Sequence, residues 1–152
     1  MAQTRGKFIP KGGMTVGDNE NRDWNYIDKT GKVRIRVKAD HAGPFSEGLA
    51  AFGRVKTDGY LYCGYIDRTG KEVIAPVFGS CDEFSEGLAL ILLDGKWHFI
   101  DKRGGFVLNP PFAQVWSFEN GLSRVSRDLD PSRSADFGYI DMTGKVIWKQ
   151  EE

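Results

Sequence analysis

The chain has little of what most catalytic and metal-binding sites need, because its 152 residues include only two histidines and two cysteines. Cys63 and Cys81 form no metal-binding or redox motif, and His41 and His98 alone cannot build a standard zinc site. No serine or cysteine stands in a recognisable nucleophile motif near either histidine. We therefore expect a protein that is not an enzyme, has no metal site and uses no cofactor.

Long apolar runs and an excess of one charge are also missing. No stretch approaches the roughly 20 apolar residues of a membrane-spanning helix, and residues 1–16 lack the apolar run of a secretory signal. Lys and Arg together number 21, as do Asp and Glu, so the net charge is zero. We expect a cytoplasmic protein without a nucleic-acid or membrane partner. In that setting Cys63 and Cys81 are expected to be two half-buried thiols rather than a disulfide.

What the sequence does have is an internal repeat. A tripeptide of an aromatic residue, Ile and Asp occurs four times, and a glycine follows each aspartate three residues later: Tyr26-Ile27-Asp28 with Gly31, Tyr65-Ile66-Asp67 with Gly70, Phe99-Ile100-Asp101 with Gly104, and Tyr139-Ile140-Asp141 with Gly144. A second motif, Phe-x-x-Gly-Leu, begins at Phe45, Phe84 and Phe118, always 17 residues after the aspartate. From this phenylalanine to the next aspartate the spacing is 22, 17 and 23. The constant segment predicts packed core, and all variation in length falls in the other segment.

Local patterns predict strands joined by tight turns. Residues 97–101 are rich in aromatic and β-branched side chains, which is typical of a strand. The following Asp-x-Thr-Gly pattern predicts a type I turn, in which the aspartate accepts the N–H two residues on and the glycine takes a positive φ. Second strands are expected at 32–37, 72–75, 106–109 and 145–148, with Pro76 and Pro110 ending two of them. A third strand at 88–93 turns back at Asp94-Gly95.

The predicted fold is therefore all-β. It consists of about four tandem three-stranded antiparallel meander repeats of roughly 34–40 residues each, stacked into a single repeat domain over residues 1–152. The units are a degenerate first unit at 7–47, then 48–86, 87–120 and a truncated last unit at 121–149. A lone unit cannot bury both faces of its sheet, so the core is expected between neighbouring units.

This pattern resembles the WG-repeat family of bacterial β-repeat proteins. The family unit reads approximately Phe-x-Glu-Gly-Leu-Ala, a variable stretch, and then Trp-Gly-Tyr-Ile-Asp-x-x-Gly. The resemblance covers residues 24–148, and its best copy runs from Phe84 to Gly104. The namesake Trp-Gly pair is altered in every copy, which read Trp24-Asn25, Cys63-Gly64, Trp97-His98 and Phe137-Gly138. The resemblance implies a binding or scaffold role and brings no catalytic residues with it.

The repeat also decides which polar residues are candidates for a site. The four aspartates of the tripeptides recur once per unit at turn positions, so we interpret them as architecture rather than as catalytic or metal-binding groups. Residues that the repeat does not require lie in three long hairpins and at the altered Trp-Gly pairs. From these we select as candidate partner-binding residues Asp18, Glu20, Asp23, Asp58, Tyr60, Tyr62, His98, Asp128, Asp130, Arg133 and Asp136. The hairpins can equally be tolerated insertions.

We therefore predict a non-catalytic protein-binding module whose partner is another protein. The specific form that we favour is an immunity or inhibitor protein that caps a cognate toxin, such as a nuclease, through acidic loops that occupy a basic groove. The alternative is a carbohydrate or cell-wall binding module that uses tryptophan and tyrosine faces. The lack of a secretion signal argues against this alternative.

Overall fold

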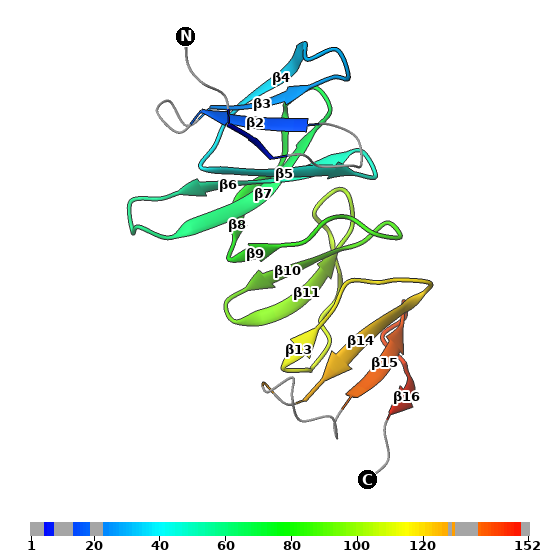
Figure 1. Ribbon diagram of the computed structural model, residues 1–152. Helices are drawn as coiled ribbons and strands as arrows, with labels where there is room; N and C mark the ends of the chain where they lie inside the picture. The colour runs from blue at the N-terminus through cyan, green and yellow to red at the C-terminus, as the bar shows by residue number, and fades with distance from the viewer. Residues whose placement is uncertain (1–4, 8–13, 19–22, 128, 130–136, 150–152) are drawn as a thin grey trace. The chain divides into compact units, whose positions relative to one another are not determined.

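The computed structural model describes residues 5–7, 14–18, 23–127, 129 and 137–149, with only the backbone of 5–7 and 14–18 (Figure 1). The described residues form strands and turns without any helix, which confirms the all-β prediction. The chain divides into two compact units, Met1–Glu83 and Phe84–Glu152.

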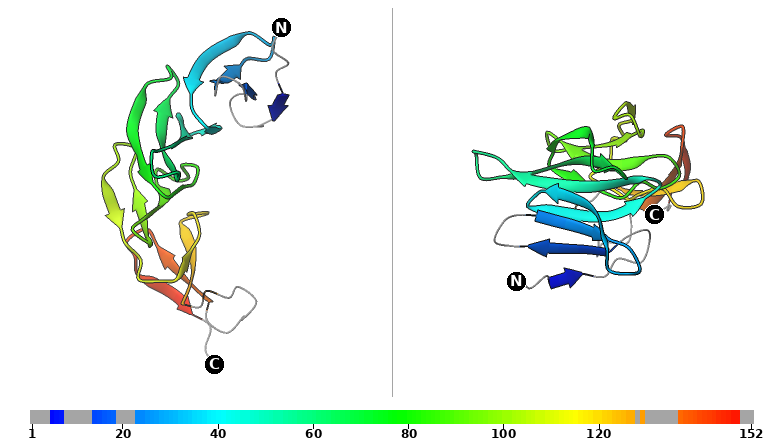
Figure 2. Two further views of the ribbon diagram at one scale, coloured as in Figure 1. Left: turned by 90° about the vertical axis from the view of Figure 1, so that its left-hand side faces the viewer. Right: turned by 90° about the horizontal axis from the view of Figure 1, so that it is seen from above.

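The first unit contains two four-stranded antiparallel sheets in which strands that are consecutive in sequence are neighbours (Figures 1 and 2). The first sheet consists of β1 (Arg5–Lys7), β2 (Met14–Asp18), β3 (Asp23–Ile27) and β4 (Val33–Lys38). The second consists of β5 (His41–Ser46), β6 (Leu49–Val55), β7 (Leu61–Asp67) and β8 (Glu72–Phe78). A short strand, β9 (Ser80–Cys81), follows near the end of the unit.

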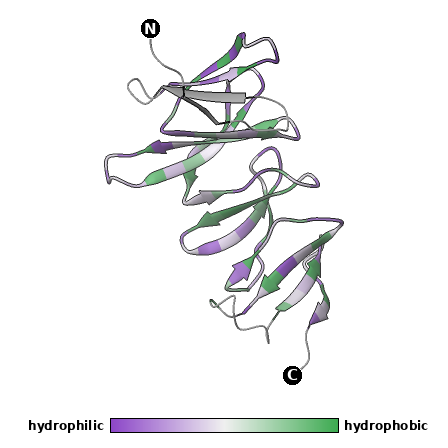
Figure 3. Ribbon diagram, in the orientation of Figure 1, coloured by the Kyte–Doolittle hydropathy of each residue, from purple (hydrophilic) through white to green (hydrophobic). Residues whose placement is uncertain are grey.

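The second unit repeats this arrangement. Strands β10 (Ala89–Leu93), β11 (Lys96–Ile100) and β12 (Phe106–Leu108) form one antiparallel meander. The last sheet is ordered β13 (Gln114–Val115), β14 (Leu122–Ser126), β15 (Phe137–Asp141) and β16 (Val146–Lys149). Strand β10 is apolar along its whole length (Figure 3), and Ala89, Leu90 and Ile91 are buried.

The predicted tandem meanders are present, and the connection before each Phe motif adds a short strand that the sequence did not indicate. In the second sheet this strand is β5, which pairs with β6 through Ala42↔Phe52 and then, after a register shift, Phe45↔Ala50. The shift interrupts the regular alternation of buried and exposed residues, so the pattern that marks a strand in a sequence is missing here.

The expectation that Pro76 ends its strand is wrong, because β8 continues to Phe78. The ladder is irregular around the proline: Tyr65 pairs with Ile74, whereas Cys63 pairs with Phe78. This β-bulge accommodates a residue that has no N–H to donate.

The predicted turns are confirmed in all four copies. At the first, the Gly31 N–H donates to the Asp28 carbonyl at 2.9 Å, the Asp28 N–H donates to the Lys32 carbonyl at 2.9 Å, and φ of Gly31 is +84°. A register shift lies beside the turn, between Tyr26 and Ile27. This is a type I turn with a G1 bulge, and equivalent pairs of backbone hydrogen bonds close the turns that begin at Asp67, Asp101 and Asp141.

The recurring tyrosines explain the constant 17-residue segment of the first unit. The Tyr26 hydroxyl donates to the Gly43 carbonyl at 2.7 Å, and its ring centroid lies 4.7 Å from that of Phe45. The Tyr65 hydroxyl donates to the Asp82 carbonyl at 2.6 Å. Burial raises the pKa of both tyrosines well above the ordinary value, so these hydroxyls remain donors. A longer or shorter segment would misplace the accepting carbonyl.

Apolar side chains of consecutive sheets pack together within each unit, as expected for a core between repeats. In the first unit, Tyr26 and Val37 of the first sheet lie in one cluster with Phe45, Phe52 and Ile66 of the second. In the second unit the cluster includes Leu90 and Phe99 of one meander and Phe118, Val125 and Ile140 of the last sheet. The rings of Phe99 and Phe118 are 4.6 Å apart, in the same relation as Tyr26 and Phe45.

A comparison of two turn glycines tests this packing. Gly70→Val is expected to lower the free energy of unfolding more than Gly31→Val. Both glycines have φ of +84°, so both substitutions carry the left-handed strain of roughly 1–2 kcal/mol. A Cβ at Gly70 would also lie 2.8 Å from Cγ2 of Ile35, whereas one at Gly31 meets nothing within 4 Å. Urea denaturation measures the difference, and equal losses would contradict the contact with Ile35.

Candidate functional site

The carboxylates of the repeated aspartates are engaged within their own turns. Asp67 Oδ1 accepts the Thr69 N–H at 2.8 Å, the Thr69 hydroxyl at 2.6 Å and the Lys71 N–H at 3.2 Å. Asp28 and Asp141 accept the same three kinds of hydrogen bond, and Asp101 accepts the two backbone N–H groups. The geometry agrees with our interpretation of these residues as architecture.

These hydrogen bonds favour the ionised carboxylates. The threonine hydroxyl is the main cause that holds the pKa of Asp28, Asp67 and Asp141 below the usual range, with backbone N–H groups adding to it. For Asp101 the N–H groups of Gly105 and Arg103 lower the pKa. Each turn is therefore stabilised by a negative charge at neutral pH.

The hairpin between β6 and β7 projects from its sheet and carries three of the predicted binding residues, Asp58, Tyr60 and Tyr62 (Figures 1 and 2). Its tip has a defined conformation. The Gly59 N–H donates to the Lys56 carbonyl at 2.9 Å, the Lys56 N–H donates to the Tyr60 carbonyl at 3.0 Å, and φ of Gly59 is +82°. The tip is therefore a type I turn with a G1 bulge, like the turns of the repeat.

Side chains hold this tip in place. Asp58 accepts the Tyr60 N–H at 2.9 Å and the Tyr62 hydroxyl at 2.8 Å, and these bonds, the N–H first, lower the pKa of Asp58. The Lys56 ammonium lies 4.4 Å from the centroid of the Tyr62 ring, within cation–π range. Tyr60 is 70% exposed, and its neighbour Leu61 is 45% exposed. The hairpin thus presents an aromatic and an aliphatic side chain on a braced backbone.

The other predicted residues lie elsewhere or cannot be placed. Asp23 begins β3, is half-buried and pairs in register with Lys38. Asp18 ends β2, and only its backbone is described. The remaining loop residues, Glu20, Asp128, Asp130, Arg133 and Asp136, lie outside the described residues. The hairpin at 56–62 is therefore where the described structure brings several candidates together, and Lys56 and Leu61 belong to it although they were not selected.

The two copies that keep the glycine of the Trp-Gly pair have a steric reason to keep it. A Cβ at Gly64 would lie 2.2 Å from the Ile74 carbonyl oxygen, and one at Gly138 would lie 2.9 Å from that of Trp148, so the outer strand crosses closely over this position. In the third copy β12 ends at Leu108, opposite Phe99, and His98 has room for a side chain. The His98 ring is half-buried and lies edge-on to Phe106 at 5.0 Å.

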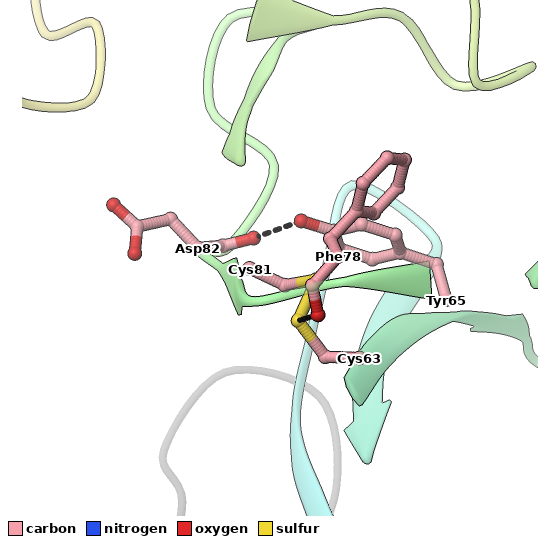
Figure 4. Close-up of a disulfide and its surroundings, with 5 residues drawn as sticks. All are labelled: Cys63, Tyr65, Phe78, Cys81 and Asp82. Carbon is pink, nitrogen blue, oxygen red and sulfur yellow. Dashed lines mark hydrogen bonds between the residues drawn. A yellow bond between two sulfur atoms is a disulfide. The ribbon is translucent and has the colours of Figure 1, made fainter. Parts of the chain in front are cut away.

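The expectation of two separate thiols is wrong. Cys63 of β7 and Cys81 of β9 form a disulfide, with an S–S distance of 2.12 Å, across 18 residues (Figure 4). The Tyr65 hydroxyl donates to the carbonyl of Asp82, the residue next to Cys81 (Figure 4). This hydrogen bond also holds the connection after β8 against β7. The sequence could not show that Cys81 lies close to Cys63, because Cys81 lies in a segment without a strand pattern.

The disulfide stands in for a contact that tryptophan makes in two other repeats. Trp24 packs on His41 with ring centroids 5.9 Å apart, and Trp97 Nε1 donates to the Ala113 carbonyl at 3.2 Å. In each case the side chain reaches the connection that follows its own meander. Cys63 occupies the tryptophan position of the second repeat, where the link is covalent. Disulfides persist mainly in oxidising compartments, so the bond argues against the cytoplasmic expectation from which the free thiols were inferred, and that location stays a prediction.

Among the residues that the structure describes, no group of three or more His, Cys, Asp or Glu side chains is placed to hold a metal ion. No helix among the described residues has the length and apolar character needed to cross a membrane.

Comparison with known protein families gives a match over most of the chain. The family described as "WG containing repeat" matches three times, at residues 24–60, 64–97 and 99–128. Among curated proteins, none matches the chain.

Solved structures share the fold at low sequence identity. The structure titled "Crystal structure of the eukaryotic initiation factor" is similar with a TM-score of 0.67 and 12% identity, covering 100% of this chain and 45% of that one. The structure titled "KlHsv2 with loop 6CD replaced by a Gly-Ser linker" has a TM-score of 0.65 and 11% identity, covering 95% of this chain and 51% of that one. This chain therefore matches about half the length of these proteins, and at such identity the likeness concerns the fold alone.

The lowered pKa of the turn aspartates predicts a loss of stability in acid. A carboxyl whose folded pKa lies below its unfolded value of about 3.9 stabilises the fold above that pH, and its contribution is lost as the pH falls toward the folded pKa. Asp67→Asn keeps an oxygen acceptor but cannot titrate. Urea unfolding at pH 7 and pH 3 should therefore show a smaller acid loss for Asp67→Asn than for the wild type. Glu83→Gln, at an exposed position, is the control, and an acid loss as large in Asp67→Asn as in wild type would contradict the assignment.

Removing the disulfide is expected to destabilise the first unit without a change of fold. The double variant Cys63→Ser, Cys81→Ser should lose about 3 kcal/mol of unfolding free energy, the cost of freeing a loop of this size in the unfolded chain. Thiol reductant should lower the denaturation midpoint of the wild type and leave that of the double variant unchanged. A wild type that is indifferent to reductant would show that the two thiols are not joined in solution.

Proposed function

The chain belongs to the WG-repeat family, and we propose that it is a non-catalytic, repeat-based module that binds another protein through the hairpin of residues 56–62. The observation that carries the proposal is Tyr60, which is 70% exposed on a tip braced by Asp58, Lys56 and Tyr62. Exposed tyrosines on rigid loops are frequent binding hot spots, because they offer a large contact area and lose little conformational freedom.

The charges of the hairpin bear on the kind of partner. Lys56 and Asp58 carry opposite charges, so the tip has no net charge from its described residues. The Asp58 carboxylate already accepts two hydrogen bonds. Recognition at this tip would therefore rest on the Tyr60 ring and on apolar contact with Leu61 rather than on an acidic surface.

A narrower form of the proposal is an immunity or inhibitor protein that caps a toxin. In that form the hairpin supplies an apolar anchor, and acidic side chains of the other long hairpins, such as Glu20 and Asp128, occupy a basic groove of a toxin such as a nuclease. The alternative, a carbohydrate or cell-wall binding module, would use the same exposed Tyr60 ring as a stacking surface.

Tyr60→Ala tests the proposal against Val73→Ala, which removes another exposed apolar group of the same unit, 39% exposed and at the end of the β7–β8 ladder that lies away from the hairpin. The tagged chain is used to capture a partner protein from cells, and the affinity of the identified partner is then measured for each variant. Tyr60→Ala is expected to weaken binding at least about tenfold, as for a hot-spot residue. Val73→Ala should bind like the wild type, and both variants should keep their stability within about 0.5 kcal/mol.

Equal affinities of the wild type and Tyr60→Ala would remove the hairpin from the interface. Retention of the chain on a glycan array or on peptidoglycan, with a loss in Tyr60→Ala, would favour the carbohydrate alternative. A captured partner with nuclease activity that the chain inhibits would support the narrower form.

A further inference from the structure

The last strand of the first sheet, β4, carries a row of cations that the repeat does not require. Six residues after the turn aspartate β4 has Arg34, whereas the other meanders have Val73, Val107 and Ile147. Arg36 and Lys38 follow at alternating positions of the strand, and all three cations are exposed. The positive charge therefore belongs to this strand and not to the repeat.

The alternation of β4 separates apolar from basic side chains (Figure 3). Val37 is buried in the hydrophobic cluster that joins the first two sheets, and Ile35 packs against that cluster. Because successive side chains of a strand point to opposite faces, Arg36 and Lys38 lie on the face turned away from the cluster. They stand two residues apart, which is about 7 Å along the strand.

The charges of Arg36 and Lys38 are not taken up by acids of the chain. Across the ladder Arg36 pairs in register with the uncharged Asn25, and Lys38 pairs with Asp23. Neither cation forms an ion pair with a residue that the structure describes, whereas the neighbouring Arg34 is engaged at 2.7 Å by the carboxylate of its turn. Two exposed cations are therefore available to the acids of a partner.

The backbone of β4 is available as well, because this strand is an edge of its sheet (Figure 1). The Lys38 carbonyl faces outward, since it accepts a hydrogen bond from Arg54 Nε at 3.0 Å. In an antiparallel ladder every second residue turns its N–H and C=O the same way, so those of Arg36 also face outward. No backbone hydrogen bond of the described residues closes the outer edge of 33–37. This edge can accept another strand.

The exposure of this surface is a property of the meander. In the second sheet β8 holds the place of β4, and that sheet packs on the first through one hydrophobic cluster. Val73 and Ala75, which correspond to Arg34 and Arg36 when counted from the turn aspartates, are nevertheless exposed. The outer face of the last strand therefore stays accessible even where another sheet packs beside it.

We infer that β4 binds an extended acidic segment of a partner protein, which adds to the first sheet as a fifth strand. The backbone of the segment pairs with the open edge, and acidic residues at every second position lie beside Arg36 and Lys38. The same cations disfavour pairing with a basic or apolar strand, so the edge is selective. The inference rests on the proposed protein-binding function but assigns a surface other than the hairpin of residues 56–62.

A second copy of this chain has no strand of this kind to offer. Among the described strands at the edges of the four sheets the only acid is Glu72 of β8, and it is bound to Arg54 at 2.5 Å. A nucleic acid is also disfavoured, because its affinity depends on the number of phosphates neutralised and β4 has two uncommitted cations. A peptide gains both from these charges and from the backbone edge.

The probe is a synthetic seven-residue peptide of alternating valine and glutamate, acetylated and amidated at its ends. It is titrated into the full-length, ¹⁵N-labelled chain, and amide shifts report where it binds. We expect shifts concentrated in residues 33–38 and an affinity that falls as the salt concentration rises. The same peptide with glutamine in place of glutamate should bind far more weakly.

Two methylated peptides test whether the segment adds as a strand. In an antiparallel pairing that places a glutamate opposite Arg36, the glutamate N–H groups face β4 and the valine N–H groups face away. N-methylation of every glutamate should therefore abolish binding, because the ladder hydrogen bonds cannot form. N-methylation of every valine should leave binding within a few-fold of the unmodified peptide.

Variants of the chain test the charges. The double variant Arg36→Gln, Lys38→Gln should weaken peptide binding about fivefold or more, through the loss of two ion pairs. The matched control Lys96→Gln, Arg103→Gln removes two exposed cations of the other compact unit and should bind like the wild type. Tyr60→Ala should also bind the peptide like the wild type, so a failure of the hairpin proposal and a failure of this one appear in different variants.

Several results would overturn the inference. They are no binding of the peptide by the wild type, equal binding of the two methylated peptides, and an equal loss in the matched control. Tighter binding of a single-stranded oligonucleotide than of the peptide, lost in Arg36→Gln, Lys38→Gln, would make a nucleic acid the occupant instead. Self-association of the wild type in sedimentation velocity that the same double variant abolishes would make it a second copy.

Discussion

The fold depends on the contact between one aromatic side chain and the connection that follows it. In the first repeat the Tyr26 hydroxyl reaches the Gly43 carbonyl and its ring reaches Phe45, and Phe99 and Phe118 repeat the ring contact in the second unit. Because this contact joins consecutive sheets, the chain length between its two ends cannot change without separating them. On the other side of the meander the length of the hairpin varies from one repeat to the next. One interaction therefore accounts both for what is constant in the repeat and for where the chain is free to differ.

A second link stands two residues before the first. It is aromatic packing at Trp24, a hydrogen bond at Trp97 and a disulfide at Cys63. All three links hold the connection against the meander that precedes it. A cysteine there buries far less apolar surface than a tryptophan would, so a covalent bond restores what packing no longer supplies. At Cys63 the altered pair is thus a replacement of one kind of link by another, rather than simple decay of the repeat.

The sequence was sufficient for the features that recur. Four copies of the turn motif specified the Asx hydrogen bonds and the positive φ of Gly31 and its equivalents, and the constant spacing specified the core. The sequence was insufficient where a contact depends on which distant segments the fold brings together. Cys81 lies in a segment with no strand pattern, so its approach to Cys63 was invisible, and Pro76 sits in a bulge that lets β8 continue. For the site, the long hairpin at 56–62 could be selected because the repeat does not require it, but the bracing of Tyr60 by Asp58 and Lys56 depends on side-chain geometry.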